Sequence, residues 1–251
     1  MKALILAAGE GVRLRPYTLD RPKCMVEIGG KSLLERQLAV METEGIDPVI
    51  LIGGYRSEML HRFEVPVRVN PRYFETNMLW TLFCAEPDLE GELIVSYGDI
   101  VYSRENLRAL KESAADIAVV IDLDWESYWR SRNEDPLADA ETLKLSQDGQ
   151  ILEIGKKPKT FQDIEGQYMG LMKFSATGVK ALKEFFHAAK ATGMLQGKPL
   201  EKAYMTDLLQ AMIEAGYVVS SVCVHGKWVE IDTVADLLSD VSSSRLKEIS
   251  L

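Results

Sequence analysis

Continuous apolar runs alternate with stretches of helical spacing along this chain. Residues 1–8 form the first apolar run, residues 32–43 repeat apolar positions at helical spacing, and residues 48–52 form a second apolar run that ends at Gly53. Two buried strands joined by one helix predict a βαβ unit in a parallel sheet covered on both faces. Ligands of such sheets bind at the carboxyl ends of the strands, so we expect Gly9 and Gly53 on the same edge.

The same pattern continues through the rest of the chain. Further strands are predicted at residues 65–70, 92–96, 117–122, 142–145, 151–154, 168–174 and 217–224. Further helices are predicted at residues 76–85, 104–113, 177–191, 205–214 and 234–247. Residues 124–139 contain two Trp, two Arg and several acids and interrupt the alternation, which predicts an insertion or lid.

Length and composition fit one compact enzyme domain. The chain has 251 residues, of which 47% are hydrophobic, enough to fill a core. Its 29 basic and 38 acidic residues give a net charge of -9, which argues against a nonspecific nucleic-acid binder. Three scattered cysteines support neither a disulfide framework nor a zinc site. The chain has no apolar run of membrane-spanning length and starts within the first strand, so we expect a cytoplasmic protein.

A glycine loop follows the first strand. Without side chains at Gly9 and Gly11, phosphate oxygens can approach the backbone N–H groups closely. Arg13 can bind two phosphate oxygens at once, and Lys23 adds a second positive charge. The loop is neither a Walker loop nor a dinucleotide loop, because Leu14 stands next and no third glycine follows. We therefore predict a nucleoside triphosphate site; the alternative is that the glycines only close a tight turn.

The residues from Leu6 to Leu14, followed by Arg21-Pro22-Lys23, resemble the opening of the nucleotidyltransferases that make nucleotide sugars and CDP-activated alcohols. The resemblance implies a single Rossmann-like α/β domain over residues 1–251, with a mostly parallel mixed sheet and helices on both faces. Its halves would bind the nucleotide (residues 1–122) and the acceptor (residues 123–251). The implied nucleotide contacts are Leu6, Ala7, Ala8, Gly9, Glu10, Gly11, Gly54, Tyr55, Asn77, Ser96 and Gly98.

Two acidic motifs are candidates for metal binding. Asp99 follows an apolar strand and should lie at the same edge as the glycine loop. Glu230 and Asp232 are two positions apart, so both carboxylates point to one side of an extended segment. Mg2+ prefers oxygen ligands of this kind. The alternatives are a simple turn at Asp99 and a helix cap at Asp232 or Thr233. In the family that the chain resembles, the aspartates matching Asp99 and Asp232 together bind Mg2+.

The chemistry expected of such an enzyme is attack by an acceptor phosphate oxygen on the α-phosphorus of the triphosphate, with loss of pyrophosphate. Positioning and positive charge should dominate, and no side-chain nucleophile is required. We expect Arg13 at the β and γ phosphates and Lys23 at the α-phosphate. Mg2+ on Asp99 and Asp232 should bridge acceptor and donor.

The sequence around Lys157-Pro158 bears on the acceptor. Family members that use hexose 1-phosphates have a Glu-Lys-Pro motif here, in which the Glu binds sugar hydroxyls. Lys156 stands in place of that Glu, and a cation cannot accept hydrogen bonds from hydroxyls. Lys157 remains a candidate ligand of the acceptor phosphate; the alternative is a solvated basic turn.

Aromatic and acidic residues gather in the second half of the chain and would suit an ammonium group. The pattern resembles the choline-phosphate cytidylyltransferases of bacterial surface decoration and their relatives that act on aminoalkyl phosphonates or phosphorylated amino acids. We therefore expect a Mg2+-dependent cytidylyltransferase that uses CTP and a small zwitterionic phosphate or phosphonate. The candidate acceptor contacts are Trp125, Trp129, Asp139, Glu141, Lys157, Tyr168, Trp228 and Glu230.

Other interpretations are open at this point. Each aromatic residue taken singly can be explained by core packing. The chain could instead be a sugar-1-phosphate nucleotidyltransferase that uses UTP, dTTP or GTP, or a noncatalytic protein that senses a nucleotide. Nucleic-acid and membrane partners are not expected, and a homodimer is compatible with the resemblance.

Overall fold

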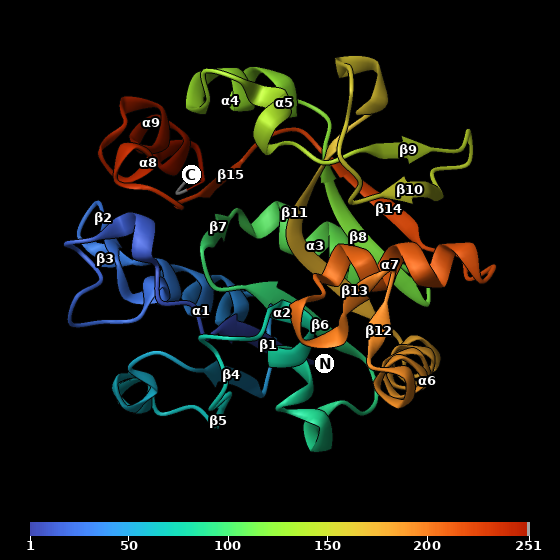
Figure 1. Ribbon diagram of the computed structural model, residues 1–251. Coiled ribbons are helices and arrows are strands. Elements are labelled where there is room, and N and C mark those ends of the chain that lie inside the picture. The colour runs from blue at the N-terminus through green and yellow to red at the C-terminus, as the bar shows by residue number, and fades with distance from the viewer. Residues whose placement is uncertain (250–251) are drawn as a thin grey trace.

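The computed structural model describes residues 1–249 and is built around one mixed sheet of seven strands (Figure 1). The strand order is β14-β8-β11-β6-β1-β4-β5. All neighbouring strands are parallel except at β11, which runs antiparallel to both β6 and β8. The strands are β1 (Lys2–Ala7), β4 (Val49–Gly53), β5 (Val67–Val69), β6 (Leu93–Tyr97), β8 (Ile117–Asp122), β11 (Gln167–Phe174) and β14 (Ser220–Val224).

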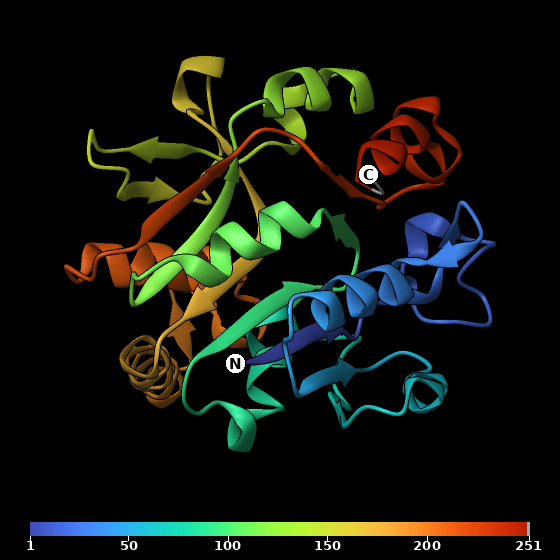
Figure 2. The same cartoon turned by 180° about the vertical axis from the view of Figure 1, so that it is seen from behind.

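Helices cover both faces of this sheet, because alternate residues of each strand point to opposite sides. In β1, Ala3 and Ile5 belong to one apolar core, and Leu4 belongs to the other. The first core is covered by α1 (Leu33–Thr43) and α3 (Arg104–Glu112), which lie in front of the sheet in Figure 2. The second core is covered by α2 (Met78–Phe83), α6 (Ala176–Thr192) and α7 (Met205–Glu214). The expected fold class is confirmed.

The carboxyl ends of β1, β4 and β6 meet at one edge of the sheet. Ala7 of β1 pairs with Gly53 of β4, and the N–H of Tyr55 donates to the carbonyl of Ala8 at 3.2 Å. On the other side of β1, the N–H of Gly98 donates to the carbonyl of Leu6 at 3.0 Å. The loops that follow these three strands are therefore neighbours, as the βαβ pattern predicts.

Residues 124–139 fold as two helices packed on the core, α4 (Trp125–Arg132) and α5 (Pro136–Asp139). The single helix predicted over residues 234–247 is divided into α8 (Val234–Leu238) and α9 (Asp240–Ile249), because Ser239 between them has extended backbone. No helix among the described residues combines the length and the apolar character needed to cross a membrane.

Among residues 1–249, four short antiparallel pairs lie outside the main sheet. The predicted strands at residues 142–145 and 151–154 form one of them and do not join the central sheet. The pairs are β2 (Glu27–Ile28) with β3 (Lys31–Ser32), β7 (Ile100–Tyr102) with β15 (Trp228–Glu230), β9 (Leu143–Leu145) with β10 (Ile151–Ile154), and β12 (Met194–Leu195) with β13 (Lys198–Pro199). Short 3-10 helices span Val12–Leu14, Lys23–Met25, Ser57–Phe63, Glu86–Asp88, Phe161–Asp163 and Leu200–Lys202.

Candidate active site

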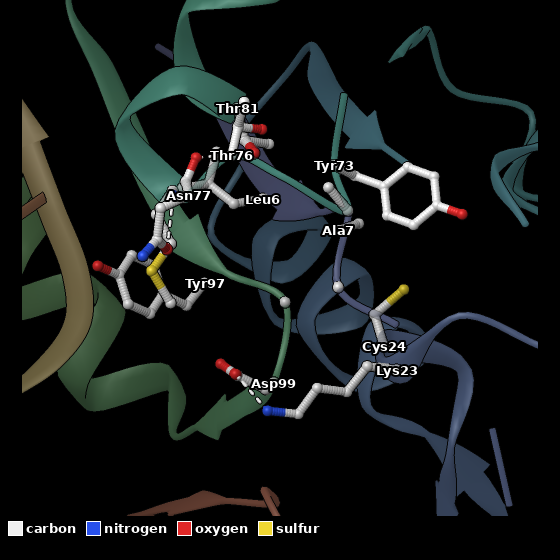
Figure 3. Close-up of a pocket in the computed structure, with 14 residues that line it drawn as sticks. Leu6, Ala7, Lys23, Cys24, Tyr73, Thr76, Asn77, Thr81, Tyr97 and Asp99 are labelled. Atoms are coloured by element: carbon white, nitrogen blue, oxygen red, sulfur yellow. Dashed lines mark hydrogen bonds and ion pairs between the residues drawn. The ribbon is translucent and has the colours of Figure 1, made fainter. Parts of the chain in front are cut away.

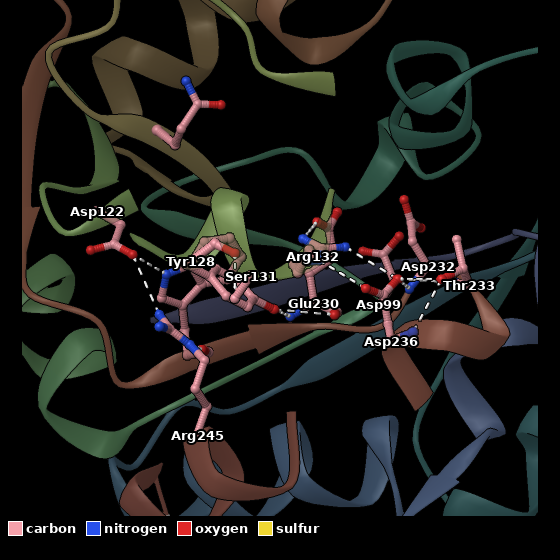
Figure 4. Close-up of polar contacts among 12 residues, drawn as sticks. Asp99, Asp122, Tyr128, Ser131, Arg132, Glu230, Asp232, Thr233, Asp236 and Arg245 are labelled. Carbon is pink, nitrogen blue, oxygen red and sulfur yellow. Dashed lines mark hydrogen bonds and ion pairs between the residues drawn. The ribbon is translucent and has the colours of Figure 1, made fainter. Parts of the chain in front are cut away.

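Three carboxylates from two distant segments meet beside the carboxyl end of β6. The antiparallel pairing of β7 with β15 sets Ile100 opposite Glu230, and the N–H of Ile231 donates to the carbonyl of Asp99 at 3.0 Å. One carboxylate oxygen from each of Asp99, Glu230 and Asp232 lies within 4.8 Å of the others. Figure 4 shows these side chains gathered in one region. The predicted meeting of Asp99 with Asp232 therefore occurs, and Glu230 joins them.

Lys23 lies among these carboxylates. Its Nζ atom is 2.6 Å from Asp99 Oδ2 and also donates to Asp232 (Figure 3 shows the contact with Asp99). Burial by itself would lower the pKa of Lys23, but the negative charges of Asp99 and Asp232 outweigh it and raise that pKa above its usual value. Lys23 is therefore a fixed positive charge within the cluster.

The cluster has the donor set of a divalent-cation site. Asp99 Oδ1 is buried and has no hydrogen-bond partner within residues 1–249. Such an orphaned oxygen is rare and calls for a cation or a donor. Burial and the neighbouring Asp232 raise the pKa of Glu230 to about 7, whereas Lys23 holds the pKa of Asp232 below its usual value despite burial. These residues fit Mg2+, with Asp99 and Asp232 as ligands and Glu230 beside them.

The glycine loop lies next to this cluster. Within the part of the chain that the structure describes, the backbone N–H groups of Gly9, Glu10 and Gly11 donate to no protein acceptor. Gly11 has a left-handed backbone (φ 65°), and a Cβ atom there would come within 3.1 Å of Lys23 Cβ. Glu10 forms an ion pair with Arg15. The loop therefore presents free donors beside Lys23, as an anion site requires.

A first cavity opens between this loop and the start of α2 (Figure 3). Six of the predicted nucleotide contacts line it: Leu6, Ala7, Ala8, Gly9, Asn77 and Gly98. Only glycine fits at position 98, because a Cβ atom there would lie 2.7 Å from the carbonyl oxygen of Leu6. Asn77 also caps α2, because its Oδ1 atom accepts from the N–H of Met78 at 2.8 Å.

Five predicted nucleotide contacts do not line the first cavity. Ser96 is fully buried, and its hydroxyl donates to Gln37 Oε1 at 2.8 Å, so the prediction for this side chain is corrected. Tyr55 turns its hydroxyl to the carbonyl of Leu19 at 2.8 Å. Of the other three, Glu10 and Gly11 belong to the glycine loop, and Gly54 follows β4 and packs against Tyr73.

A second cavity borders the cluster from the other side. Glu230 and Asp232 line it, Asp99 lines the first cavity, and Tyr97 and Met78 are shared by both. Most of the predicted acceptor contacts are found here. Those lining it are Trp129, Asp139, Glu141, Tyr168, Trp228 and Glu230.

Negative charge prevails in the second cavity. Its lining includes four carboxylates and one cation, Arg13, which lies 2.7 Å from Asp232 Oδ2. Arg13 was expected at the β and γ phosphates, whereas here its guanidinium borders the second cavity. Burial, together with Asp207 and Asp139, raises the pKa of Glu141 to about 7, although Lys198 opposes the shift.

Two predicted acceptor contacts lie outside this lining. Trp125 is 4% exposed and packs against Phe161, with ring centroids 6.1 Å apart, so core packing explains it. Lys157 donates to the carbonyl of Leu137 at 2.7 Å and to that of Ala138, and does not reach the cavity. Trp228 lines the cavity, but its indole N–H is fixed by Asp122 at 2.7 Å.

Several lining residues were not predicted. Tyr97 precedes the Gly98-Asp99 pair and stands at the end of a strand that was recognised, so its position alone could have indicated it. Gln167 was visible only as the residue before a predicted strand. Tyr73 and Met78 had no sequence signal beyond their proximity to Asn77.

Comparisons with known proteins agree with this geometry. Residues 3–170 match the model of the MobA-like NTP transferase domain. The CTP:phosphoglutamine cytidylyltransferase of Campylobacter jejuni subsp. jejuni serotype O:2 is 37% identical over 94% of this chain and 98% of its own length. The choline-phosphate cytidylyltransferase of Streptococcus pneumoniae is 32% identical over 41% of this chain and 46% of its own length.

Similarity also extends to solved structures. The inositol-1-phosphate CTP transferase from T. maritima superimposes with a TM-score of 0.75 at 21% identity, covering 99% of this chain and 96% of that one. This likeness confirms the α/β fold, and the sequence matches confirm the resemblance noted at the glycine loop. The chain belongs to the family of MobA-like NTP transferase domains and is a nucleotidyltransferase.

Proposed function

We propose that this protein transfers the cytidylyl group of CTP to a small phosphorylated or phosphonate acceptor with a cationic head group, with Mg2+ as cofactor and pyrophosphate as product. The observation that carries the proposal is the meeting of two chemically different cavities at Asp99, Glu230 and Asp232. Donor and acceptor phosphates both need positive charge, and each cavity opens at this cluster.

The first cavity and the glycine loop beside it together supply what a triphosphate needs. The free N–H groups of Gly9, Glu10 and Gly11 can donate to phosphate oxygens, and Lys23 stands beside them. Two of the similar proteins are named for their use of CTP, which favours cytosine over the other bases. Asn77, whose side chain lines the cavity, is the candidate contact for the base or ribose.

In the proposed reaction an oxygen of the acceptor phosphate bonds to the α-phosphorus of CTP. The bond from that phosphorus to the bridging oxygen breaks, and pyrophosphate leaves. Mg2+ held by Asp99 and Asp232 would neutralise the phosphate oxygens that approach one another. Lys23 stabilises the charge that develops around the α-phosphorus, and the loop amides donate to the departing pyrophosphate. Arg13, already at the cluster, holds a phosphate oxygen of donor or acceptor.

The second cavity favours a cationic head group. Asp139 and Glu141 lie at its lining with the aromatic faces of Trp129 and Tyr168, a combination that binds ammonium groups. Lys198 lies near the same end, 2.7 Å from Asp207 and 5.1 Å from the ring centroid of Tyr204. An acceptor with both an ammonium and a carboxylate group finds partners of both signs there.

A phosphorylated amino acid is therefore our first candidate acceptor. The relative that is 37% identical over most of both chains is named for phosphoglutamine, which has such a head group. A reaction that consumes CTP also fits the expected cytoplasmic location.

The direct test is a matrix of donors and acceptors in which pyrophosphate release is measured. CTP, UTP, dTTP and GTP are each combined with phosphoglutamine, phosphocholine, 2-aminoethylphosphonate and glucose 1-phosphate. We expect the highest kcat/KM for CTP with an amine-bearing acceptor, and phosphoglutamine as the preferred acceptor. Turnover of glucose 1-phosphate alone would contradict the proposal and favour the sugar-1-phosphate alternative.

The head-group assignment has its own test in Glu141→Gln. Because the pKa of Glu141 is raised to about 7, its carboxylate gains charge as the pH rises through 7. We expect the acceptor KM of the wild type to fall over that range. In the variant KM should be about tenfold higher and depend less on pH, with kcat little changed. The remaining pH dependence is that of Glu230, whose pKa is also raised to about 7 and which lines the same cavity. Glu184→Gln on the exposed face of α6 is the control; equal pH profiles for wild type and Glu141→Gln would contradict the assignment.

A further inference from the structure

Arg132 is a buried cation next to the carboxylate cluster. It ends α4, and only 6% of its side chain is exposed. Its guanidinium lies 2.6 Å from Glu230 Oε2 and 2.9 Å from Asp236 Oδ1, with a further contact of 3.3 Å to Asp236 Oδ2. Figure 4 shows Arg132, Glu230, Asp236 and Asp232 close together, with dashed lines marking their contacts. Arg132 therefore joins a member of the cluster to the start of α8.

Asp236 extends this contact to Asp232. Its Oδ2 atom accepts from the backbone N–H of Asp232 at 3.1 Å and from that of Thr233 at 2.8 Å. It also accepts from the hydroxyl of Thr233 at 2.9 Å. The backbone that carries Asp232 is thus fixed by Asp236, and Asp236 is fixed by the planar fork of Arg132.

Tyr128, one turn earlier in α4, holds the same segment from a second point. Its hydroxyl accepts from the N–H of Glu230 at 3.0 Å and donates to the carbonyl of Glu230 at 3.3 Å. The guanidinium of Arg132 lies 5.1 Å from the ring centroid of Tyr128 and 5.6 Å from that of Trp129. Since Trp129 lines the second cavity, α4 contacts both that cavity and the segment of residues 230–236.

Capping of α8 does not by itself explain Arg132. Thr233 and Asp236 already form a reciprocal capping box, which needs no buried guanidinium. Three carboxylates, at Glu230, Asp232 and Asp236, fall within seven residues and would repel one another without a cation between them. A buried cation that holds these carboxylates in place would offset their repulsion. It would also orient those that bind a metal.

We propose that Arg132 is a positioning residue of the metal centre: through Glu230 and Asp236 it holds the carboxylates of the 230–236 segment where they can bind a divalent cation. This inference rests on the proposed function, which supplies the need for that cation. Helix α4 lies in the segment that was predicted as an insertion or lid. The inference gives this helix a part in metal binding.

The test compares Mn2+ binding by Arg132→Lys, Arg132→Met and the wild type. Free Mn2+ is followed by electron paramagnetic resonance during titration of each protein, with and without CTP. We expect 10- to 100-fold weaker Mn2+ binding in both variants, the effect typical of removing a residue that orients a metal ligand. The Mg2+ concentration that half-activates pyrophosphate release should rise by the same factor. CTP binding in the presence of EDTA should be unchanged.

Arg130→Lys is the matched control, because Arg130 lies on the same helix, is half exposed and pairs with Glu126. We expect its Mn2+ affinity to equal that of the wild type. Asp236→Asn repeats the test from the other partner without altering the buried guanidinium. It should weaken Mn2+ binding as the Arg132 variants do, which keeps the inference testable where Arg132→Met does not fold.

A purely structural role would give a different result. Thermal midpoints would then fall while the folded Arg132→Lys and Asp236→Asn proteins bound Mn2+ within twofold of the wild type, and that outcome would overturn the inference. Failure of the proposed function is distinguishable, because in that case the wild type itself would not turn over CTP with any acceptor. If the wild type is active and the variants bind Mn2+ more weakly, the result supports both the proposed function and the positioning role of Arg132.

Discussion

Two charge clusters of opposite sign show what distinguishes a structural ion pair from a ligand site. In the first, Glu44 at the end of α1 is surrounded by three cations of α3, namely Arg104, Arg108 at 2.8 Å and Lys111 at 3.8 Å. In the second, Lys23 is surrounded by Asp99 and Asp232, with Glu230 beside them. Two more cations border the second cluster: Arg13 pairs with Asp232, and Arg132 pairs with Glu230 and with Asp236. With these partners included, the second cluster has four carboxylates and three cations, whereas the first has one carboxylate and three cations. Each cluster thus has an excess of one sign.

The clusters differ in how far the side chains with the excess charge are exposed to solvent. The side chains of Arg104, Arg108 and Lys111 are 51%, 43% and 37% exposed, so water screens their surplus positive charge. Asp99 and Asp232 are only 15% and 18% exposed, and Asp99 Oδ1 has no partner among residues 1–249. Surplus charge held away from water is costly unless a counter-ion binds. The second cluster therefore needs a ligand, and the first does not.

The largest effect is expected from Asp99→Asn, which removes a charged ligand and keeps the shape of the side chain. We expect kcat for pyrophosphate release to fall about 1,000-fold, because electrostatic stabilisation of the reacting phosphates is lost. The thermal midpoint should be unchanged or higher, since the variant relieves repulsion with Asp232 and Glu230. If the thermal midpoint fell as far as it does when a large apolar core side chain is truncated, the cluster would have a structural role.

Removing Lys23 tests the buried cluster from the side of its cation. Lys23→Met leaves the carboxylates of Asp99 and Asp232 without their partner, and breaking a mostly buried pair in this way costs about 3 kcal/mol of unfolding free energy. Urea unfolding in EDTA measures this cost. Addition of Mg2+ should recover part of it, because the metal replaces the missing positive charge. Equal stability with EDTA and with Mg2+ would count against a metal site.

The smallest effect is expected in the exposed cluster. Glu44→Gln should lower the unfolding free energy by about 1–2 kcal/mol at pH 7 and leave kcat unchanged, because the surrounding cations are screened by water. Hydrogen bonds from Arg108 and Arg104 lower the pKa of Glu44 to about 2. A lowered folded-state pKa gives stability that is present above the ordinary pKa of 4.5 and is lost as the pH falls toward 2.

Urea unfolding across this pH range checks the sign of that prediction. The difference between wild type and Glu44→Gln should shrink as the pH falls from about 5 to 2. A difference that grew on acidification, or a loss of turnover in Glu44→Gln, would remove the distinction between the two clusters.

Sequence patterns predicted the main sheet because its strands are continuous apolar runs with glycine or acid at their ends. Asp99 and Gly98 were found in this way, and both lie at the expected edge. The pairing of β7 with β15 was not predicted, since each strand has three residues and their meeting depends on long-range packing. That pairing is what places Glu230 and Asp232 beside Asp99.

Three predicted contacts lie outside both cavities for a common physical reason. Residue type indicated Trp125, and motif position indicated Lys157 and Ser96, but neither determines the direction of a side chain. Trp125 and Trp129 are four apart on α4, yet only Trp129 lines the cavity. Arg132 could not be identified, because its partners Glu230 and Asp236 are about a hundred positions away in the sequence. The position of a helix within the fold decides these cases.

The most direct test of the account is anomalous diffraction from crystals grown with Mn2+ and CTP. We predict a Mn2+ peak within coordination distance of both Asp99 and Asp232, with the Lys23 amine moved from these carboxylates to a phosphate of the nucleotide. If no peak appeared at this position and Lys23 still bridged Asp99 and Asp232 in the presence of bound CTP, the buried carboxylates would not be a metal site.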